Sequence, residues 1–255
     1  MSLSDAEGAR ADALVAAQIA EEAGRLLLTL RAASIANGTT ASGNTADIDA
    51  DELIAARLHA AYPADAILSE EAEDSTERLG AERVWIVDPL DGTREYNEAG
   101  RPDWAVHVAL WSAGELRAGA VALPDNALTF STAEPTARPE REPGPVRIAV
   151  SRSRPPEAAR QAAKALDAEL VPMGSAGAKA MAVVRGLVDA YIHAGGQWEW
   201  DSAAPIAVAR ANGLHTSRLD GAPFLWNQAT PWQPDLVICR MELAPAILAA
   251  LDAAA

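Results

Sequence analysis

A short apolar run that ends in two closely spaced carboxylates constrains this chain most. Residues 84–87 read Val-Trp-Ile-Val, and such β-branched and aromatic residues fill buried strands. The run leads directly into Asp88-Pro89-Leu90-Asp91-Gly92-Thr93. Both carboxylates are therefore expected at the end of a buried strand, which is a common place for an active site in an α/β protein.

Helix and strand patterns alternate along most of the chain. Apolar residues at three-to-four-residue spacing predict helices at about 12–30, 47–62, 156–166, 178–188, 201–211 and 243–251. Short apolar or alternating runs predict strands at 66–69, 84–87, 104–111, 116–123, 128–132, 146–150, 169–172, 190–193 and 236–239. The runs 104–111 and 116–123, with the Gly-containing turn at 112–115 between them, are expected to form a β-hairpin. Residues 37–44 are expected to form a loop of Gly, Thr, Ser and Asn. This alternation predicts the α/β class.

One segment without apolar spacing predicts a division of the chain. Residues 134–145 are rich in Pro, Glu and Arg, which is typical of a surface connection. We therefore expect an N-terminal α+β lobe at 1–133 that carries most of the candidate metal ligands. A C-terminal α/β lobe at 146–255 is expected to carry the remaining one and the substrate-binding residues.

Charge and composition exclude several functional classes. The net charge of −15 argues against broad electrostatic binding to nucleic acid or to an anionic membrane. Cys239 is the only cysteine, so intramolecular disulfides and cysteine-based metal clusters are excluded. No signal peptide is evident, and no apolar run reaches the roughly 18 residues of a membrane helix. We expect a soluble, cytoplasmic protein, in which any phosphorylated ligand needs local cations.

The acidic residues near predicted element ends suit divalent metal. Mg²⁺ prefers oxygen ligands and takes one or two protein carboxylates per ion, so two ions need acidic groups from several segments. Pro89 restricts the backbone around Asp88, and Gly92 lets the chain approach a phosphate closely, with the Thr93 hydroxyl beside it. The carboxylates available are Glu70, Asp88, Asp91 and Asp201. An Asp-Pro-x-Asp-Gly segment is, however, also a good surface turn, and these residues alone leave both interpretations open.

Three separated segments together resemble one known family. They are Ser69-Glu70-Glu71, the stretch from Trp85 to Thr93, and Trp200-Asp201-Ser202-Ala203-Ala204-Pro205. In this order they resemble the inositol monophosphatase-like family of Mg²⁺-dependent, lithium-sensitive phosphatases. That resemblance implies an α-β-α-β-α sandwich with two lobes. Arg94-Glu95-Tyr96, the segment 174–179 and the segment 219–227 resemble the 3′(2′),5′-bisphosphate nucleotidase branch.

The resemblance implies a role for each site residue. Two or three Mg²⁺ ions would be held by Glu70, Asp88, the Leu90 carbonyl, Asp91 and Asp201. Gly92 and Thr93 would contact the scissile phosphate, and Thr93 and Glu70 would help to orient and deprotonate the attacking water. Asp47 would pair with Thr93 and support a further metal. Its surroundings match the family pattern only in part, and a helix N-terminal acid is the alternative role.

Residues for the rest of the substrate follow from weaker matches. Ser175 and Lys179 would bind the second phosphate or the nucleotide, Glu199 the base or sugar, and Arg94 the substrate. Lys179 and Arg94 could instead be ordinary surface residues, and Glu199 could simply hold a packed corner. The four histidines, including His107 in a predicted strand, are expected to be structural.

The implied activity is hydrolysis of the 3′-phosphate of adenosine 3′,5′-bisphosphate by a monomer or homodimer. Its sulfated relative, 3′-phosphoadenosine 5′-phosphosulfate, is a further candidate substrate. Inositol monophosphatase and fructose-1,6-bisphosphatase activities remain alternatives, because the metal chemistry is shared within the family. The alternative from another class is a catalytically silent metal- or nucleotide-binding protein. Retention of Glu70 and Thr93 argues against it.

Overall fold

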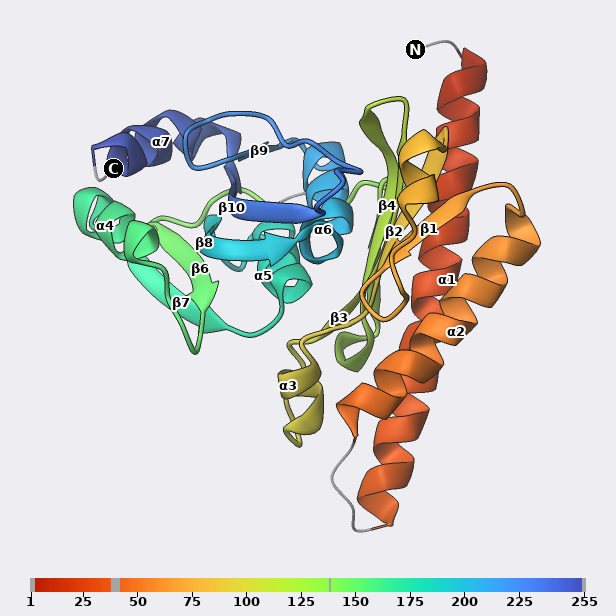
Figure 1. Cartoon of the computed structure of the whole chain (residues 1–255). Coiled ribbons are helices and arrows are strands. Elements are labelled where there is room, and N and C mark those ends of the chain that lie inside the picture. Colours follow the sequence, from red (N-terminus) through yellow and green to blue (C-terminus); the bar gives the residue numbers. More distant parts are fainter. Residues whose placement is uncertain (1–2, 38–41, 138, 254–255) are drawn as a thin grey trace.

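Five layers of secondary structure, alternating helices and sheets, build the molecule (Figure 1). The computed structural model describes residues 3–37, 42–137 and 139–253. The α-helices of these residues are α1 (Leu3–Ala36), α2 (Gly43–Ala61), α3 (Thr93–Asn97), α4 (Glu157–Leu166), α5 (Ala176–Val184), α6 (Glu199–Ala211) and α7 (Ala244–Asp252). Their strands are β1 (Ala66–Ser69), β2 (Arg83–Asp91), β3 (Ala105–Ser112), β4 (Glu115–Leu123), β5 (Leu128–Ser131), β6 (Arg147–Ser151), β7 (Glu169–Met173), β8 (Ala190–Trp198), β9 (Leu214–Ser217) and β10 (Trp232–Arg240). The predicted α/β class and α-β-α-β-α sandwich are confirmed.

The first sheet has the order β1-β2-β3-β4-β5. β1 and β2 are parallel, so their carboxyl ends meet at the same edge, and the other pairs are antiparallel. The predicted hairpin joins β3 to β4 through Ala113 and Gly114, which both have positive φ. Positive φ at both positions is what a type I′ turn requires.

β2 is buried on both faces, and its alternation decides where its side chains point. Trp85 and Val87 pack in the outer core with α1 and α2, whereas Val84 and Ile86 belong to the inner core. Because side chains alternate along a strand, Asp88 continues the inner-facing set. The strand therefore directs Asp88 toward the middle helix layer.

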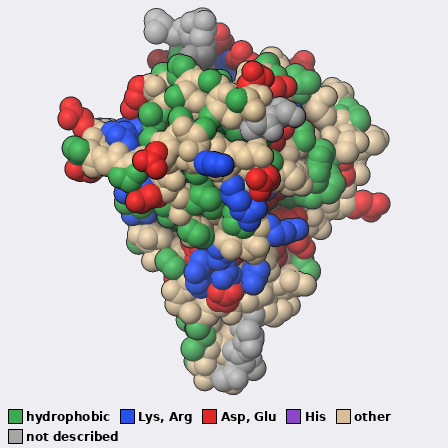
Figure 2. Space-filling view, turned by 90° about the vertical axis from the view of Figure 1, so that its left-hand side faces the viewer, with side chains coloured by type: hydrophobic (Ala, Val, Ile, Leu, Met, Phe, Trp, Pro, Cys, Tyr) green, Lys and Arg blue, Asp and Glu red, His purple; other side chains and the backbone are tan. Residues whose placement is uncertain are grey.

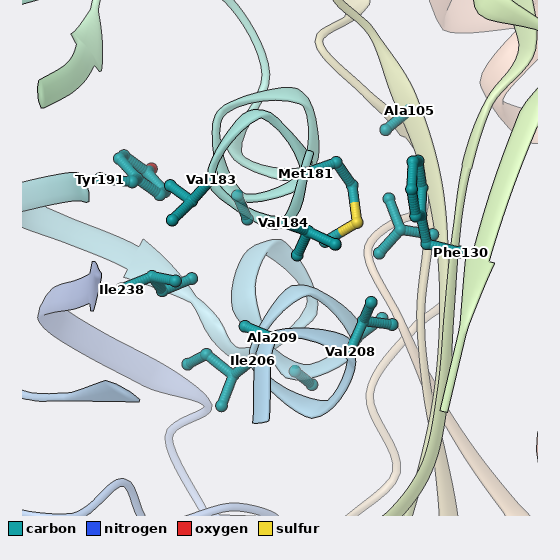
Figure 3. Packing of buried hydrophobic residues seen from close by; sticks show 14 of the residues in the cluster. Ala105, Phe130, Met181, Val183, Val184, Tyr191, Ile206, Val208, Ala209 and Ile238 are labelled. Carbon is teal, nitrogen blue, oxygen red and sulfur yellow. The ribbon is translucent and has the colours of Figure 1, made fainter. Parts of the chain in front are cut away.

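The middle layer consists of α5 and α6, which lie between the two sheets (Figure 1). Their apolar side chains, including Met181 and Val208, lie between Phe130 of the first sheet and Tyr191 of the second (Figure 3). The second sheet has the order β7-β6-β8-β10-β9, and α4 and α7 cover its other face. The inner core thus joins both sheets.

Several elements differ from the sequence prediction. α1 is longer than predicted at both ends, and α2 begins earlier, at Gly43. Residues 38–41 of the predicted loop lie outside the described residues. α3 and β9 were not predicted, because each contains a single apolar residue, Tyr96 and Leu214 respectively, and so gives no apolar pattern.

The predicted connection at 134–145 contains no helix or named strand in its described part. It lies against the second half of the chain, where Pro139 accepts hydrogen bonds from the Arg240 guanidinium. The division into two lobes stays a prediction. Residues of both sheets contribute to the inner core. Over the described ranges, no helix is both long and apolar enough to cross a membrane.

The approach of α6 to β4 gives a test of this packing. A Cβ atom added at Gly119 would lie 2.7 Å from the Ala207 Cβ and 3.4 Å from the Ala204 carbonyl oxygen. We expect Gly119→Ala to lower the free energy of unfolding by about 1–3 kcal/mol, as overpacking does. Urea unfolding measures this loss.

The matched control is Gly8→Ala in α1, where an added Cβ meets nothing within 4 Å. Because alanine is the better helix former, this change should leave the stability unchanged or raise it by up to about 1 kcal/mol. Equal stability of the two variants would contradict the close packing at Gly119.

Candidate active site

Three buried or half-buried carboxylates from distant segments converge beside the inner core. Asp88 and Asp91 end β2 and are almost fully buried, and Asp201 lies in the first turn of α6. Oxygen atoms of the three side chains all lie within 4.8 Å of one another. The register between β2 and β3 is irregular between Asp88 and Asp91, which lets both carboxylates reach one place.

Glu70 follows β1 at the same edge of the sheet. Because Ser69 pairs in register with Val87, the next residues of both strands, Glu70 and Asp88, come together. Desolvation, together with the negative charges of Asp201 and Asp91, raises the pKa of Glu70 to about 7.

Asp91 is held by the first turn of α5. Its carboxylate accepts hydrogen bonds from the backbone N–H groups of Ala176 and Gly177, at 3.0 and 2.6 Å, and from the Ser175 hydroxyl. Burial alone would raise its pKa, but His107, Lys179 and Ser175 more than offset that effect and lower it. Asp91 is therefore ionised and fixed in orientation.

Asp47 and Thr93 form the other side of the cluster. The Thr93 hydroxyl lies 3.5 Å from Asp47 Oδ2 and 3.3 Å from the Leu90 carbonyl oxygen. Asp47 Oδ1 is buried and has no hydrogen-bond partner among the described residues. Burial and the charges of Glu70 and Glu71 raise the pKa of Asp47 to about 8.

Gly92 makes the tight turn between β2 and α3. Its φ is +94°, in the left-handed region that favours glycine, and an added Cβ would lie 3.2 Å from the Ser175 Cβ. Thr93 begins α3 directly afterward. This turn places the Thr93 hydroxyl beside the carboxylates.

The residues predicted for the rest of the substrate lie in different surroundings. Ser175 is the N-cap of α5, and its hydroxyl donates to Asp91. The Lys179 ammonium is buried and donates to the Gly174 and Ser175 carbonyls, and burial lowers its pKa. A direct contact of Lys179 with phosphate stays a prediction that this geometry does not favour.

Glu199 is fully buried at the start of α6. Its two carboxylate oxygens accept backbone hydrogen bonds from Asn227 and Gln228, at 2.7 and 2.9 Å. This arrangement favours the alternative that Glu199 holds a packed corner. A contact with the base or sugar stays a prediction.

Arg94 is exposed next to the turn at Gly92. Its side chain is 66% exposed and lies 3.7 Å from Glu98. Arg101 and Arg152 also surround Glu98, and the hydrogen bond from Arg152 lowers the pKa of Glu98. Figure 2 shows basic side chains gathered on the lower part of the face that it presents. Arg94, Arg101 and Arg152 are each paired with a carboxylate, of Glu98, Asp103 and Glu95 respectively, so their charge is largely balanced locally.

His107 is the site residue that the sequence prediction missed. It is fully buried in β3, paired directly with Asp88, and its Nε2 lies 3.2 Å from Asp91 Oδ2. Its Nδ1 lies 3.1 Å from the Trp200 carbonyl oxygen. The alternation of His107 with Val106 and Val108 was the available signal, because it puts the imidazole on the opposite face from these valines.

The donor set fits divalent metal. Burial and the neighbouring Asp91, Glu70 and Asp201 charges raise the pKa of Asp88 well above its usual value. Burial and the Asp91 charge likewise raise the pKa of Asp201 to about 6. These carboxylates repel one another in a dry place, and oxygen-rich clusters of this kind bind Mg²⁺. The partnerless Asp47 oxygen provides a further acceptor.

Comparison with known proteins agrees with this fold and site. Residues 7–253 match the model of the inositol monophosphatase family, and the chain therefore belongs to that family. The predicted family membership is confirmed.

Two sequence relatives and one solved structure cover most of the chain. The chain is 50% identical over 238 residues to a 3′-phosphoadenosine 5′-phosphate phosphatase from Mycobacterium bovis, which covers 90% of this chain and 89% of that protein. It is 31% identical over 189 residues to the 3′(2′),5′-bisphosphate nucleotidase CysQ of Escherichia coli, with 70% and 76% covered. The crystal structure of CysQ from Bacteroides thetaiotaomicron superposes with a TM-score of 0.77 at 25% identity, over 91% of this chain and 97% of that one.

The charge cluster predicts an unusual response to Asp88→Asn. Asparagine keeps the acceptor for the Leu90 N–H but removes one of the repelling charges. In EDTA the variant should therefore melt at least as high as the wild type, and a gain of about 1 kcal/mol would raise Tm by about 2–4 °C. The rise in Tm that Mg²⁺ produces in the wild type should be lost, because it depends on metal binding.

Thermal unfolding with and without Mg²⁺ measures both effects. Asp235→Asn is the control. Asp235 forms an ion pair with Arg218, with 2.8 Å between the two side chains, and does not belong to this cluster. That variant should lose some stability in both conditions and keep the response to Mg²⁺. An undiminished Mg²⁺ response in Asp88→Asn would argue against a metal site here.

Proposed function

We propose that this chain is a Mg²⁺-dependent phosphomonoesterase that removes the 3′-phosphate from adenosine 3′,5′-bisphosphate. The convergence of Asp88, Asp91 and Asp201 carries the chemical part of the proposal. The substrate part is supported by the 50% identity to relatives named 3′-phosphoadenosine 5′-phosphate phosphatase. In a cytoplasmic setting, this activity would remove the by-product of sulfate activation.

The residues that would hold two or three Mg²⁺ ions are the carboxylates of Glu70, Asp88, Asp91 and Asp201 and the carbonyl of Leu90. When bound, these ions lower the pKa of a water molecule and neutralise charge on phosphate oxygens. Asp91 is kept in place for this role by its bonds to the first turn of α5.

Thr93 and Glu70 would handle the attacking water. The Thr93 hydroxyl can donate its hydrogen to Asp47 or to the Leu90 carbonyl, which leaves its lone pairs to accept a hydrogen bond from that water. The Glu70 carboxylate would accept a proton from this water as a general base. Asp47 then acts by orienting the hydroxyl.

Three tryptophans beside Asp201 would receive the base. Trp198 stacks on Trp200 with ring centroids 5.3 Å apart and meets Trp232 edge-on at 5.2 Å. Trp198 and Trp232 remain 40% and 44% exposed. The Trp198 backbone N–H donates to the Asp201 carboxylate at 2.6 Å, so this aromatic surface lies directly beside the carboxylate cluster. Purine bases stack on such surfaces.

A substrate panel tests the activity. With Mg²⁺, we expect the wild type to release phosphate from adenosine 3′,5′-bisphosphate with a higher kcat/KM than from inositol 1-phosphate or fructose 1,6-bisphosphate. Asp88→Asn should lose nearly all of this release, because it removes one of the carboxylates that would hold the ions. Preference for inositol phosphate or fructose bisphosphate would overturn the substrate. Equal, low release by both proteins would support the catalytically silent alternative.

Replacement of Trp198 tests base recognition. Stacking of one base on an aromatic ring is worth about 1–3 kcal/mol, so Trp198→Ala should raise KM for the nucleotide about tenfold or more. KM for a base-free phosphate ester should stay within about twofold. The control is Trp111→Leu. Trp111 lies near the end of β3 and pairs with Val84, four residues before Asp88 on β2, so this change should leave both KM values unchanged. Equal effects of Trp198→Ala on both substrates would argue against stacking.

A further inference from the structure

Arg78 is a fully buried arginine whose hydrogen bonds link the two halves of the chain. It lies in the short helical turn Thr76–Gly80 and is only 2% exposed. Its guanidinium binds both carboxylate oxygens of Asp74, at 2.6 and 2.9 Å. The same group donates to Asn227 Oδ1 at 2.6 Å and to the Gln228 carbonyl at 2.9 Å. One side chain thus fixes the segment after β1 to a loop 149 residues away.

The loop that receives Arg78 is in turn held by Glu199. The backbone N–H groups of Asn227 and Gln228 donate to the two oxygens of the Glu199 carboxylate. Asn227 has a φ of +56°, a conformation that asparagine tolerates better than most residues, and its side-chain amide donates back to the Arg78 carbonyl. The positive charge of Arg78 also acts to lower the pKa of Glu199, against the effect of burial.

Both ends of this network lie next to candidate metal ligands. Glu70 precedes Asp74 in the segment that Arg78 ties down, and Asp201 follows Glu199 in the first turn of α6. Glu70 comes from the edge of the first sheet, whereas Asp201 comes from the middle helix layer. β1 and α6 belong to different layers, so contacts between the layers set the separation of these two carboxylates. The packing of α6 on β4 and the hydrogen bonds of Arg78 are two such contacts.

We propose that Arg78 is a positioning residue that holds Glu70 and Asp201 at the separation needed to bind divalent metal. Arginine suits this role because its planar, permanently charged group can satisfy several fixed acceptors at once. Loss of Arg78 would leave the Asp74 carboxylate, the Asn227 side-chain oxygen and the Gln228 carbonyl without the partner that they share. The first effect should be on metal affinity. The inference rests on the metal site and does not depend on the identity of the substrate.

The test measures binding of Mn²⁺ alone to the metal-free full chain, from the loss of the free-ion electron paramagnetic resonance signal. Arg78→Met should weaken Mn²⁺ binding about tenfold. It should also raise the Mg²⁺ concentration needed for half-maximal phosphate release, with KM for substrate unchanged at saturating Mg²⁺. Mn²⁺ binding is independent of catalysis, so failure of the proposed activity would not alter this result.

Arg83→Met is the matched control. Arg83 also makes ion pairs with two carboxylates, Asp12 at 3.0 Å and Asp65 at 2.8 Å, but both lie in the first half of the chain. This variant should lose stability and keep the wild-type affinity for Mn²⁺. An equal loss of affinity in both variants would mean that general destabilisation is the cause, and it would overturn the proposal.

Asn227→Ala supplies a second variant if Arg78→Met does not fold. It removes an Arg78 acceptor in the second half of the chain and leaves the charge pair with Asp74 intact. Weaker Mn²⁺ binding by Asn227→Ala would support the network. The double variant that combines Arg78→Met with Asn227→Ala should then lose less affinity than the sum of the two single losses. Wild-type Mn²⁺ affinity in either folded variant would overturn it.

Discussion

Repulsion among buried carboxylates is the constraint on which the rest of the structure depends. Asp88, Asp91 and Asp201 lie within reach of one ion, and burial raises the pKa of Asp88 and of Asp201. Such a cluster persists only where the surrounding structure is rigid enough to hold it. The elements around it supply that rigidity, and divalent metal supplies the missing positive charge.

Different elements hold different members of this cluster. The first turn of α5 and His107 orient Asp91, whereas Asp201 is held by the N–H of Trp198. Both α5 and α6 lie in the inner core that the two sheets share (Figure 3). The close contact of Gly119 with Ala207 sets how near α6 comes to the first sheet. Packing far from the chemistry therefore determines the geometry of the cluster.

Much of the fold could be predicted because its signals are local. The alternation around residues 84–87, the turn at Ala113 and Gly114, and the spacing of the longer helices each depend on a few neighbouring residues. The elements α3 and β9 were missed, because each has only one apolar residue and therefore no local apolar pattern. His107 was expected to be structural because its partners, Asp91 and the Trp200 carbonyl, come from other elements.

The sequence by itself determined the strand that ends in Asp88-Pro89-Leu90-Asp91-Gly92-Thr93 and the turn that follows it. Proline, glycine and the alternation of side chains act over a few bonds, so these features can be derived from neighbouring residues. Only the tertiary structure decided that Asp201 meets Asp88, that the Lys179 ammonium turns to backbone carbonyls, and that Arg78 reaches Asn227. These contacts join residues from different layers, and they exist because α5 and α6 pack between two sheets.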